Sequence, residues 1–388
     1  MRPCARSSRA RRSSGGRSRL PTWSARNGGA VRVVIAGKIR LAPIQAWGGT
    51  HEASRAHQES CRPRWCGGGR LAPRGLRSAG RRTDRVADSC GGDRSPTPKP
   101  IRTLKVGYLP LTDFLGMYAA IEQGYMAEEG LKLELQAMAG GATIIPAIVG
   151  GSLDFGISNY VSVIVANGQG LKIRAFSDSA YGTKASPPFA IITKKGSAIK
   201  TGKDLNGKKV AVNTRNGIVH VGVQEWIERN GGDPKTVQYV ELPFPQMPPA
   251  ITNGSVDAAA PTEPFVTVST SQDAQVLSYY LTDLRDNCAI AGFISTDDWI
   301  TKNRDAAQAF HRANTKGMDW VAKNDKTARE YAAKYANLDP AIAAKINLAA
   351  LRSTPLVEAV QFWVDMSKKW GLLAATSTLK AEDLFVKF

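Results

Sequence analysis

A four-residue motif occurs twice in this chain, and its two copies begin 103 residues apart. The first copy is Gly151-Ser152-Leu153-Asp154 and the second is Gly254-Ser255-Val256-Asp257. In each half, the motif follows a strand pattern, a helix pattern, a second strand and a short helix, and it leads into a third strand. Alternating strands and helices are typical of α/β domains. The repeat therefore predicts two α/β lobes with a cleft between them, where small-molecule sites commonly lie.

The individual elements follow from the spacing of apolar residues. Strands are predicted for 104–109, 131–135, 153–157, 171–176, 189–193, 209–213, 237–242, 256–260 and 289–295. Helices are predicted for 115–126, 142–149, 159–169, 217–229, 247–252, 302–324, 326–335, 340–348 and 356–370. The predicted units are then residues 101–193 for the first part of lobe 1, 194–287 for lobe 2, and 288–388 for the return to lobe 1 and the C-terminal helices.

Charge divides the chain near residue 100. The whole chain has 52 Lys and Arg and 33 Asp and Glu, a net charge of +19. Residues 1–100 hold 22 of the basic and 5 of the acidic residues, which leaves a net charge of +2 for 101–388. The first hundred residues are rich in Gly, Arg and Ser without helical or strand periodicity, so they are predicted to be disordered. An RNA- or DNA-binding arm is one interpretation, and a misassigned start codon or a frame error is the one that we favour.

The residues after Cys90 are small, polar and rich in proline, as in the tether of a bacterial lipoprotein. Asp88 and the lack of a preceding apolar segment do not fit that pattern. We hypothesise that the natural precursor carries a signal peptide that ends at Cys90 and that this sequence has lost it to a frame error. A lipid anchor at Cys90 would then be the protein's only contact with a membrane.

Composition argues against several classes of function for residues 101–388. No run of 18 apolar residues is present to span a membrane. Cys288 is the only cysteine in this part, which excludes an internal disulfide and a cysteine-based metal cluster. His220 and His311 stand alone, so no metal site is expected. No dinucleotide or nucleoside-triphosphate fingerprint occurs, so no cofactor is expected, and the low net charge argues against a nucleic acid partner.

Five fragments, in this order and spacing, carry a family resemblance. They are 106–110 (VGYLP), 119–134 (AAIEQGYMAEEGLKLE), 146–156 (PAIVGGSLDFG), 204–210 (DLNGKKV) and 251–260 (ITNGSVDAAA) followed by Glu263-Pro264. Residues 102–372 thereby resemble the solute-binding proteins of ABC importers, in the nitrate, sulfonate and taurine branch. The same domain is shared with a yeast-type synthase of the thiamine pyrimidine.

The resemblance implies a periplasmic-binding-protein fold of type II, with two α/β lobes, a hinge and an interlobe cleft. It implies an extracytoplasmic receptor, periplasmic or at the cell surface, that captures a small anionic or zwitterionic solute by cleft closure. Its partners would be a membrane permease and the ATPase that drives it. The hinge is expected at the two chain crossings, near 190–200 and 265–290.

Polar residues at predicted helix N-termini are the candidate ligand-binding residues, because free N–H groups at a helix N-terminus attract anions. Ordinary helix capping is the other interpretation for Ser, Thr and Asn at these positions. The full set, with the segment after the first strand and one residue near the hinge, is Thr112, Asp113, Phe114, Gly141, Ala142, Thr143, Ser158, Asn159, Tyr160, Thr214, Arg215, Asn216 and Glu263.

Several of these residues have two open interpretations. Asp113 either pairs with a ligand amine or caps the next helix. Arg215 either holds a carboxylate or sulfonate with two hydrogen bonds or is a solvated loop charge. Glu263, before Pro264, fits a structural role near the hinge. Four aromatic residues form either a wall for a ring-shaped ligand or part of the core: Phe114, Tyr160, Tyr181 and Phe189.

An enzyme on the same scaffold is the alternative to a binding protein. A pyrimidine-precursor synthase would need a Cys-rich iron motif, and an aromatic desulfinase would need a nucleophilic cysteine in the cleft. Residues 101–287 contain no cysteine. The sequence therefore favours a binding protein without a catalytic residue, and it does not identify the solute.

Overall fold

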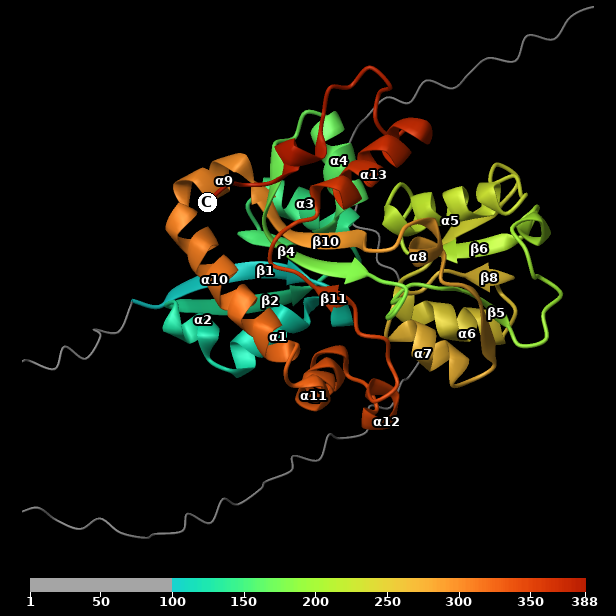
Figure 1. Ribbon diagram of the computed structural model, residues 1–388, viewed down its shortest axis with the longest axis horizontal. Helices are drawn as coiled ribbons and strands as arrows, with labels where there is room; N and C mark the ends of the chain where they lie inside the picture. Colours follow the sequence, from blue (N-terminus) through green and yellow to red (C-terminus); the bar gives the residue numbers. More distant parts are fainter. Residues whose placement is uncertain (1–99) are drawn as a thin grey trace, which may run out of the picture. The chain divides into compact units, whose positions relative to one another are not determined.

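The structure, a computed structural model, describes residues 100–388. The predictions for residues 1–99, including the disordered leader and the tether at Cys90, lie outside the described residues. Within the described part, two β-sheets are each flanked by helices, as Figure 1 shows. This confirms the α/β architecture with two lobes that the repeated pattern predicts.

The first sheet has six strands in the order β11-β4-β10-β3-β1-β2. Its strands are β1 (Arg102–Tyr108), β2 (Leu131–Ala137), β3 (Phe155–Asn159), β4 (Ile173–Gly182), β10 (Cys288–Thr296) and β11 (Ala350–Leu351). The first three are parallel to one another, and β10 lies antiparallel between β3 and β4. The chain therefore returns to the first sheet at β10, after it has formed the second.

The second sheet has five strands in the order β7-β6-β8-β5-β9. They are β5 (Ile191–Lys194), β6 (Lys209–Val212), β7 (Gln238–Glu241), β8 (Ala258–Ala259) and β9 (Ala274–Ser278). The sequence analysis groups the strand at 189–193 with lobe 1, whereas β5 pairs with β8 and β9 in the second sheet. Apolar spacing identifies a strand but not its partner, so the error lies in the pairing. The chain crosses between the sheets at 183–190 and 279–287, and the first crossing precedes the predicted hinge at 190–200.

Helices cover both faces of the sheets. The α-helices of residues 100–388 are α1 (Leu115–Glu122), α2 (Tyr125–Glu128), α3 (Gly141–Val149), α4 (Tyr160–Gly168), α5 (Ile218–Arg229), α6 (Met247–Thr252), α7 (Phe265–Thr270), α8 (Tyr280–Leu284), α9 (Asp297–Lys302), α10 (Arg304–Val321), α11 (Asp325–Ala336), α12 (Pro340–Ala343) and α13 (Val357–Lys369). Short 3-10 turns are η1 (Thr112–Phe114), η2 (Lys203–Leu205), η3 (Phe244–Gln246) and η4 (Ala381–Leu384). In Figure 1, α3, α4 and α13 lie on one face of the first sheet, and α1 and α10 lie on the other.

Most differences from the predicted elements occur at their ends. The helix predicted over 115–126 is divided into α1 and α2 by Gly124, whose φ is 78°. The helix predicted over 340–348 is a single turn, α12. The sequence analysis does not predict α7, β9 or α8. Residues 265–270 read FVTVST and are rich in β-branched side chains, which hides a short helix because such residues have low helix propensity.

The repeated Gly-Ser-x-Asp motif makes the same contacts in both lobes. Asp154 Oδ2 accepts the backbone N–H of Lys105 at 2.7 Å, and Asp257 Oδ2 accepts that of Lys209 at 2.8 Å. The motif glycines, Gly151 and Gly254, have φ values of 74° and 73°, in the left-handed region that favours glycine. Each motif thus follows a helix with a tight turn and ties that turn to a strand of its own lobe, β1 in the first and β6 in the second.

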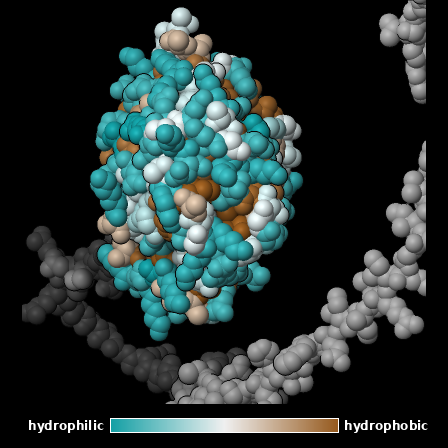
Figure 2. All heavy atoms as spheres, turned by 90° about the vertical axis from the view of Figure 1, so that its right-hand side faces the viewer, coloured by the Kyte–Doolittle hydropathy of each residue, from teal (hydrophilic) through white to brown (hydrophobic). Residues whose placement is uncertain are grey.

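The outer surface of the second lobe is mainly hydrophilic. Figure 2 shows this face with small hydrophobic areas separated by polar side chains. Across residues 100–388, no helix has both the length and the apolar character that crossing a bilayer requires.

Candidate functional site

A pocket lies between the two sheets, and residues from both lobes line it. The first lobe contributes Asp113 from η1, Gly141 from the start of α3, and Ser158 and Asn159 from the end of β3. The second lobe contributes Asn213, Ile218, Val219 and Phe244. The pocket contains about 400 Å³ of empty space, including the part open to solvent. It lies beyond the carboxyl ends of parallel strands β1, β3 and β6, which is where open α/β sheets usually bind ligands.

Most of the pocket wall is apolar. Three phenylalanines face it from separate parts of the chain, Phe114 after β1, Phe189 in the first crossing and Phe244 in η3. Leu109, Leu111, Ile157, Ile218 and Ile290 complete this apolar wall. Of the four aromatic residues considered from the sequence, Phe114 and Phe189 therefore line the pocket.

Asp113 is the acidic residue of the pocket. The residue is 2% exposed, and its Oδ1 atom is buried without a hydrogen-bond partner. No hydrogen bond between Asp113 Oδ1 and the start of α1 is found, and the N-cap residue of that helix is Phe114. Burial, followed by the nearby charge of Glu263, raises the pKa of Asp113 to about 7. A buried carboxyl oxygen that has no partner in the fold is available to accept a hydrogen bond from a solute.

Asn159 connects the two lobes at the edge of the pocket. Its Oδ1 atom accepts the backbone N–H of Ser162 in α4 at 2.9 Å and the backbone N–H of Ile218 in α5 at 3.3 Å. One side-chain oxygen therefore caps two helices that belong to different lobes. Since Asn159 is the N-cap of α4, a small outward movement of lobe 2 would break the bond to α5 and keep the bond within lobe 1.

Gly141 allows α3 to begin close to the end of β3. A Cβ atom at Gly141 would lie 2.2 Å from Ser158 Oγ. A side chain at this position would displace the Ser158 hydroxyl, so glycine keeps the N-terminus of α3 close to Ser158 at the pocket. The neighbouring Ala142 and Thr143 do not line the pocket, and the Thr143 hydroxyl donates to the Gly140 carbonyl at 2.8 Å.

Tyr160 does not line the pocket and belongs to a buried hydrogen-bonded cluster in the first lobe. Tyr160 and Tyr181 each donate a hydroxyl to Asp178, both at 2.5 Å. Burial raises the pKa of Asp178 to about 6, although both tyrosine hydrogen bonds act to lower it. Both tyrosines are therefore structural in this arrangement.

Arg215 and Asn216 lie outside the pocket, although both were candidates from the sequence. Arg215 Nη2 donates to the Tyr239 carbonyl at 2.6 Å, and its Nε lies 4.0 Å from Glu241. Both residues line a separate surface depression with Ala142. Thr112 and Thr214 lie beside pocket residues and have buried hydroxyl oxygens without a partner.

Glu263 lies close to the pocket but does not line it. Its carboxylate accepts hydrogen bonds from the Thr267 hydroxyl at 2.9 Å and from the backbone N–H of Asn347 at 3.2 Å. Burial raises the pKa of Glu263, although these hydrogen bonds act to lower it. These contacts join Glu263 to α7 and to the segment that precedes β11.

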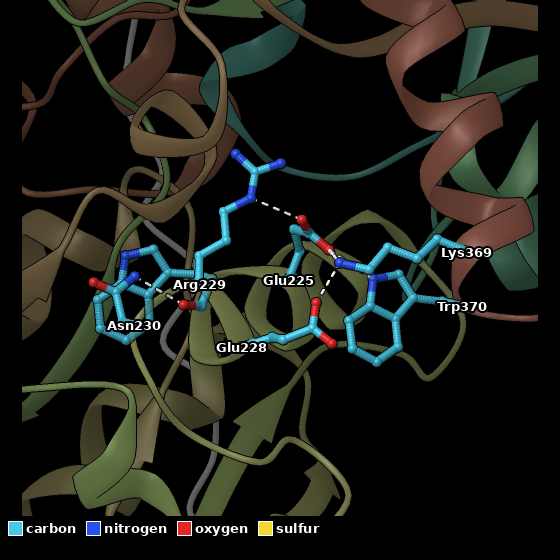
Figure 3. Close-up of polar contacts among 7 residues, drawn as sticks. Glu225, Glu228, Arg229, Asn230, Lys369 and Trp370 are labelled. Carbon is cyan, nitrogen blue, oxygen red and sulfur yellow. Dashed lines mark hydrogen bonds and ion pairs between the residues drawn. The ribbon is translucent and has the colours of Figure 1, made fainter.

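A charged network on the surface joins α5 of the second lobe to the end of α13, which packs on the first (Figure 3). Glu225, whose side chain is 2% exposed, accepts from Lys369 Nζ at 2.7 Å and from Trp370 Nε1 at 3.1 Å. Lys369 also contacts Glu228, and Arg229 Nε donates to Glu225 at 2.7 Å. Burial acts to raise the pKa of Glu225, but the Lys369 and Arg229 hydrogen bonds outweigh it and the pKa is lowered.

The sequence analysis missed several pocket residues. Leu109 and Asn213 each end the first strand pattern of a lobe, and Phe244 follows the strand predicted at 237–242. Their place at the carboxyl ends of strands was an available signal. Ile290 and Ala291 had no such signal, because they reach the pocket only after β10 inserts into the first sheet.

The NMT1/THI5-like family matches residues 111–328, more than half of the 388-residue chain. The chain belongs to this family. A curated relative, 4-amino-5-hydroxymethyl-2-methylpyrimidine phosphate synthase of Schizosaccharomyces pombe, is 24% identical over 56% of this chain. An ABC transporter periplasmic binding protein of Brachyspira hyodysenteriae is 27% identical over 50% of this chain. The matches span 64% and 59% of these two relatives.

Solved structures share the fold. The alkanesulfonate-binding protein SsuA of Xanthomonas axonopodis pv. citri superposes with a TM-score of 0.63 at 17% identity, covering 75% of this chain and 100% of that protein. The periplasmic nitrate-binding protein NrtA of Synechocystis PCC 6803 has a TM-score of 0.62 at 17% identity, covering 74% and 86%. The periplasmic-binding-protein fold predicted from the sequence is confirmed.

Proposed function

We propose that this protein is the extracytoplasmic solute-binding receptor of an ABC importer. It would capture a small organic solute between its lobes and present it to a membrane permease whose ATPase powers uptake. The observation that carries the proposal is a pocket built from both lobes, at which one side chain, Asn159, binds helices of both. Such a site binds most strongly when the lobes are together, so that solute binding favours closure. The relatives and solved structures that function as binding proteins support this proposal.

A synthase on the same fold is the second candidate, because the curated Schizosaccharomyces pombe relative is named as one. The cysteine of the described part offers little support for nucleophilic chemistry. Cys288 is buried at the start of β10, and burial raises the pKa of its thiol to about 12. A thiol held in the neutral form is a poor nucleophile. Residues 100–388 also contain no group of three His, Cys, Asp or Glu side chains arranged to hold a metal.

Hydrogen exchange of the full chain tests the proposal, because it reports each lobe separately. The solutes are nitrate, taurine, an alkyl sulfonate, an aromatic acid and an aminopyrimidine. A solute that a receptor binds should slow amide exchange on both sides of the pocket, at 140–144 and 158–162 in lobe 1 and at 213–219 in lobe 2. The same samples are analysed for chemical change of the solute.

Slowed exchange in both lobes with an unchanged solute supports the receptor. Conversion of the solute by the protein would instead establish an enzyme. Protection confined to one lobe would contradict capture by closure.

A further inference from the structure

The Asp113 side chain is the polar feature of the pocket that the fold leaves unsatisfied. Asp113 is 2% exposed as a residue, lines the pocket and has an Oδ1 atom buried without a partner. A buried carboxyl group without a hydrogen-bond donor is costly. In structures of stable proteins such groups are nearly always paired. The missing partner of Asp113 is therefore expected to arrive with the bound solute.

The charges around Asp113 are unfavourable to an anion. Among the described residues that line the pocket, none is Lys, Arg or His. Glu263 is a second buried carboxyl group close enough to raise the pKa of Asp113. Arg215, the candidate cation from the sequence, is held on Tyr239 and Glu241 instead. A cation beside Asp113 would be attracted by both carboxyl groups.

Two of the helix N-termini at the pocket, those of α4 and α5, are already partly satisfied. The N–H groups of Ser162 in α4 and Ile218 in α5 share Asn159 Oδ1 as their acceptor. An anion at these two helices would have to displace that side chain. The pocket therefore has an acceptor without a donor at Asp113, whereas the donors at α4 and α5 have an acceptor.

We propose that the pocket takes a small solute with a positively charged nitrogen, which the Asp113 carboxylate binds, and with a compact apolar body that packs on Phe114, Phe189 and Phe244. The class includes amines and protonated nitrogen heterocycles, alone or as the cationic end of a zwitterion. This assignment rests on the proposed receptor function and adds the chemical class of its solute.

Two matched sets of probes test the charge without changing the apolar body. One set is benzylamine, benzyl alcohol and benzoate, and the other is isobutylamine, isobutanol and isobutyrate. Calorimetric titration of the full chain at about pH 8 should give at least tenfold tighter binding of the amine than of the alcohol in one or both sets, since a hydrogen bond to a charged group is strong. The carboxylates should bind more weakly than the alcohols.

Substitution separates recognition from folding. Asp113→Asn should reduce binding of the amine to the level of the alcohol, while the affinity for the alcohol stays within about threefold because the apolar wall is unchanged. Binding of the alcohol thereby shows that the variant is folded. Asp319→Asn is the matched control, because Asp319 is an exposed carboxylate on α10 away from the pocket, and it should bind as the unmodified chain does.

A pH series provides a second, independent readout. Amine affinity should fall by about tenfold per unit as the pH is lowered below 7, because protonation of Asp113 removes the negative charge. Two titratable groups interact with Asp113 electrostatically, Glu263 and the Tyr118 hydroxyl, whose pKa is raised by burial, by Tyr108 and by Asp113. Binding of the alcohol should not change over the same range.

Three outcomes would overturn the assignment. The first is tighter binding of the carboxylates than of the alcohols, and the second is equal binding of amine and alcohol. The third is a preference for the amine that is retained in the Asp113→Asn variant. Absence of binding by both amines at millimolar concentration would also reject it. The receptor function is judged separately by the exchange experiment, so protection of both lobes by an anionic solute would retain the receptor and reject the cationic class.

Discussion

At the scale of single residues, the pocket contains a group that the fold keeps at the expense of stability. Asp113 is buried near a second carboxyl group and has no donor for its Oδ1 atom. Natural chains depart from good local design mainly at functional sites, and strongly shifted pKa values concentrate there. The unpaired carboxyl group therefore supports a functional role for Asp113 more directly than its position after the first strand does.

The raised pKa of Asp113 predicts how Asp113→Asn changes the pH dependence of stability. The unfolded chain releases the proton near pH 3.8, whereas the folded chain holds it until about pH 7. The free energy of unfolding that Asp113 contributes therefore falls as the pH rises through this window, by at most about 1.4 kcal/mol per unit. Urea unfolding should be measured at several pH values. The free energy of unfolding of Asp113→Asn, relative to that of the unmodified chain, should increase with pH up to about pH 7. A constant difference would contradict the raised pKa.

His220 predicts the opposite pH dependence of stability, over a pH range that overlaps with that of Asp113. Its ring packs edge-on against Tyr239 with Nε2 buried and unpartnered, and burial followed by the charge of Arg215 lowers the pKa of His220 to about 4. The unfolded chain takes up the proton near pH 6.5, so stability is lost as the pH falls from there towards 4. His220→Gln, which keeps an acceptor for the Asn216 N–H, should reduce this loss in the same unfolding series. An unchanged acid slope would show that His220 is not responsible.

At the scale of elements, the repeated motif has the same role in both lobes but unequal contacts. Asp154 also accepts from Trp299 Nε1 at 3.2 Å, whereas no such second side-chain partner is found for Asp257 in the described residues. Both alanine variants lose a hydrogen bond to a backbone N–H. Asp154→Ala should therefore destabilise by about 1–3 kcal/mol and Asp257→Ala by about 1 kcal/mol. Urea unfolding of both variants measures the difference, and an equal or reversed order would contradict the role assigned to Trp299.

The charged network between α5 and α13 gives a second prediction for these elements. Lys369→Met leaves the buried Glu225 without one of its cations, which should cost about 1–2 kcal/mol once the partial exposure of Lys369 is considered. Hydrogen exchange should become faster at 225–229 and 366–370 together. Lys368→Met is the control, because no hydrogen bond or ion pair is found for the Lys368 side chain in the described part of the chain. Equal effects of the two variants would mean that the network does not join the lobes.

At the scale of the whole molecule, Asn159 couples the lobes across the pocket. Asn159→Ala removes the acceptor of one N–H in α4 and of one in α5. In the absence of solute, amides at 216–219 should exchange faster than in the unmodified chain, and solute affinity should fall about tenfold because closure loses a favourable contact. If amide exchange became faster only in α4, Asn159 would act as an ordinary helix cap and would not couple the lobes.

The lobes and most elements were predictable because they depend on local spacing. α6 lies at the predicted residues 247–252, and most other predicted helices and strands are displaced by only a few residues. The residues of the candidate site were predictable only in part. Asp113, Phe114, Gly141, Ser158 and Asn159 line the pocket, whereas Arg215 and Tyr160 do not. A loop sequence identifies the chemical groups that are available for binding. The direction of each side chain, however, depends on contacts with distant parts of the chain.

The amino-acid sequence by itself determined the two-lobe architecture and the set of strand ends and helix starts that surround the pocket. These depend on periodic burial and on glycine and capping residues, which act within a few positions along the chain. Only the tertiary structure decided that β5 joins the second sheet, that Arg215 binds Tyr239 and Glu241, and that Asp113 is left without a donor. Pairing, charge neutralisation and desolvation are decided by contacts between distant segments, and those contacts exist only after the chain has folded.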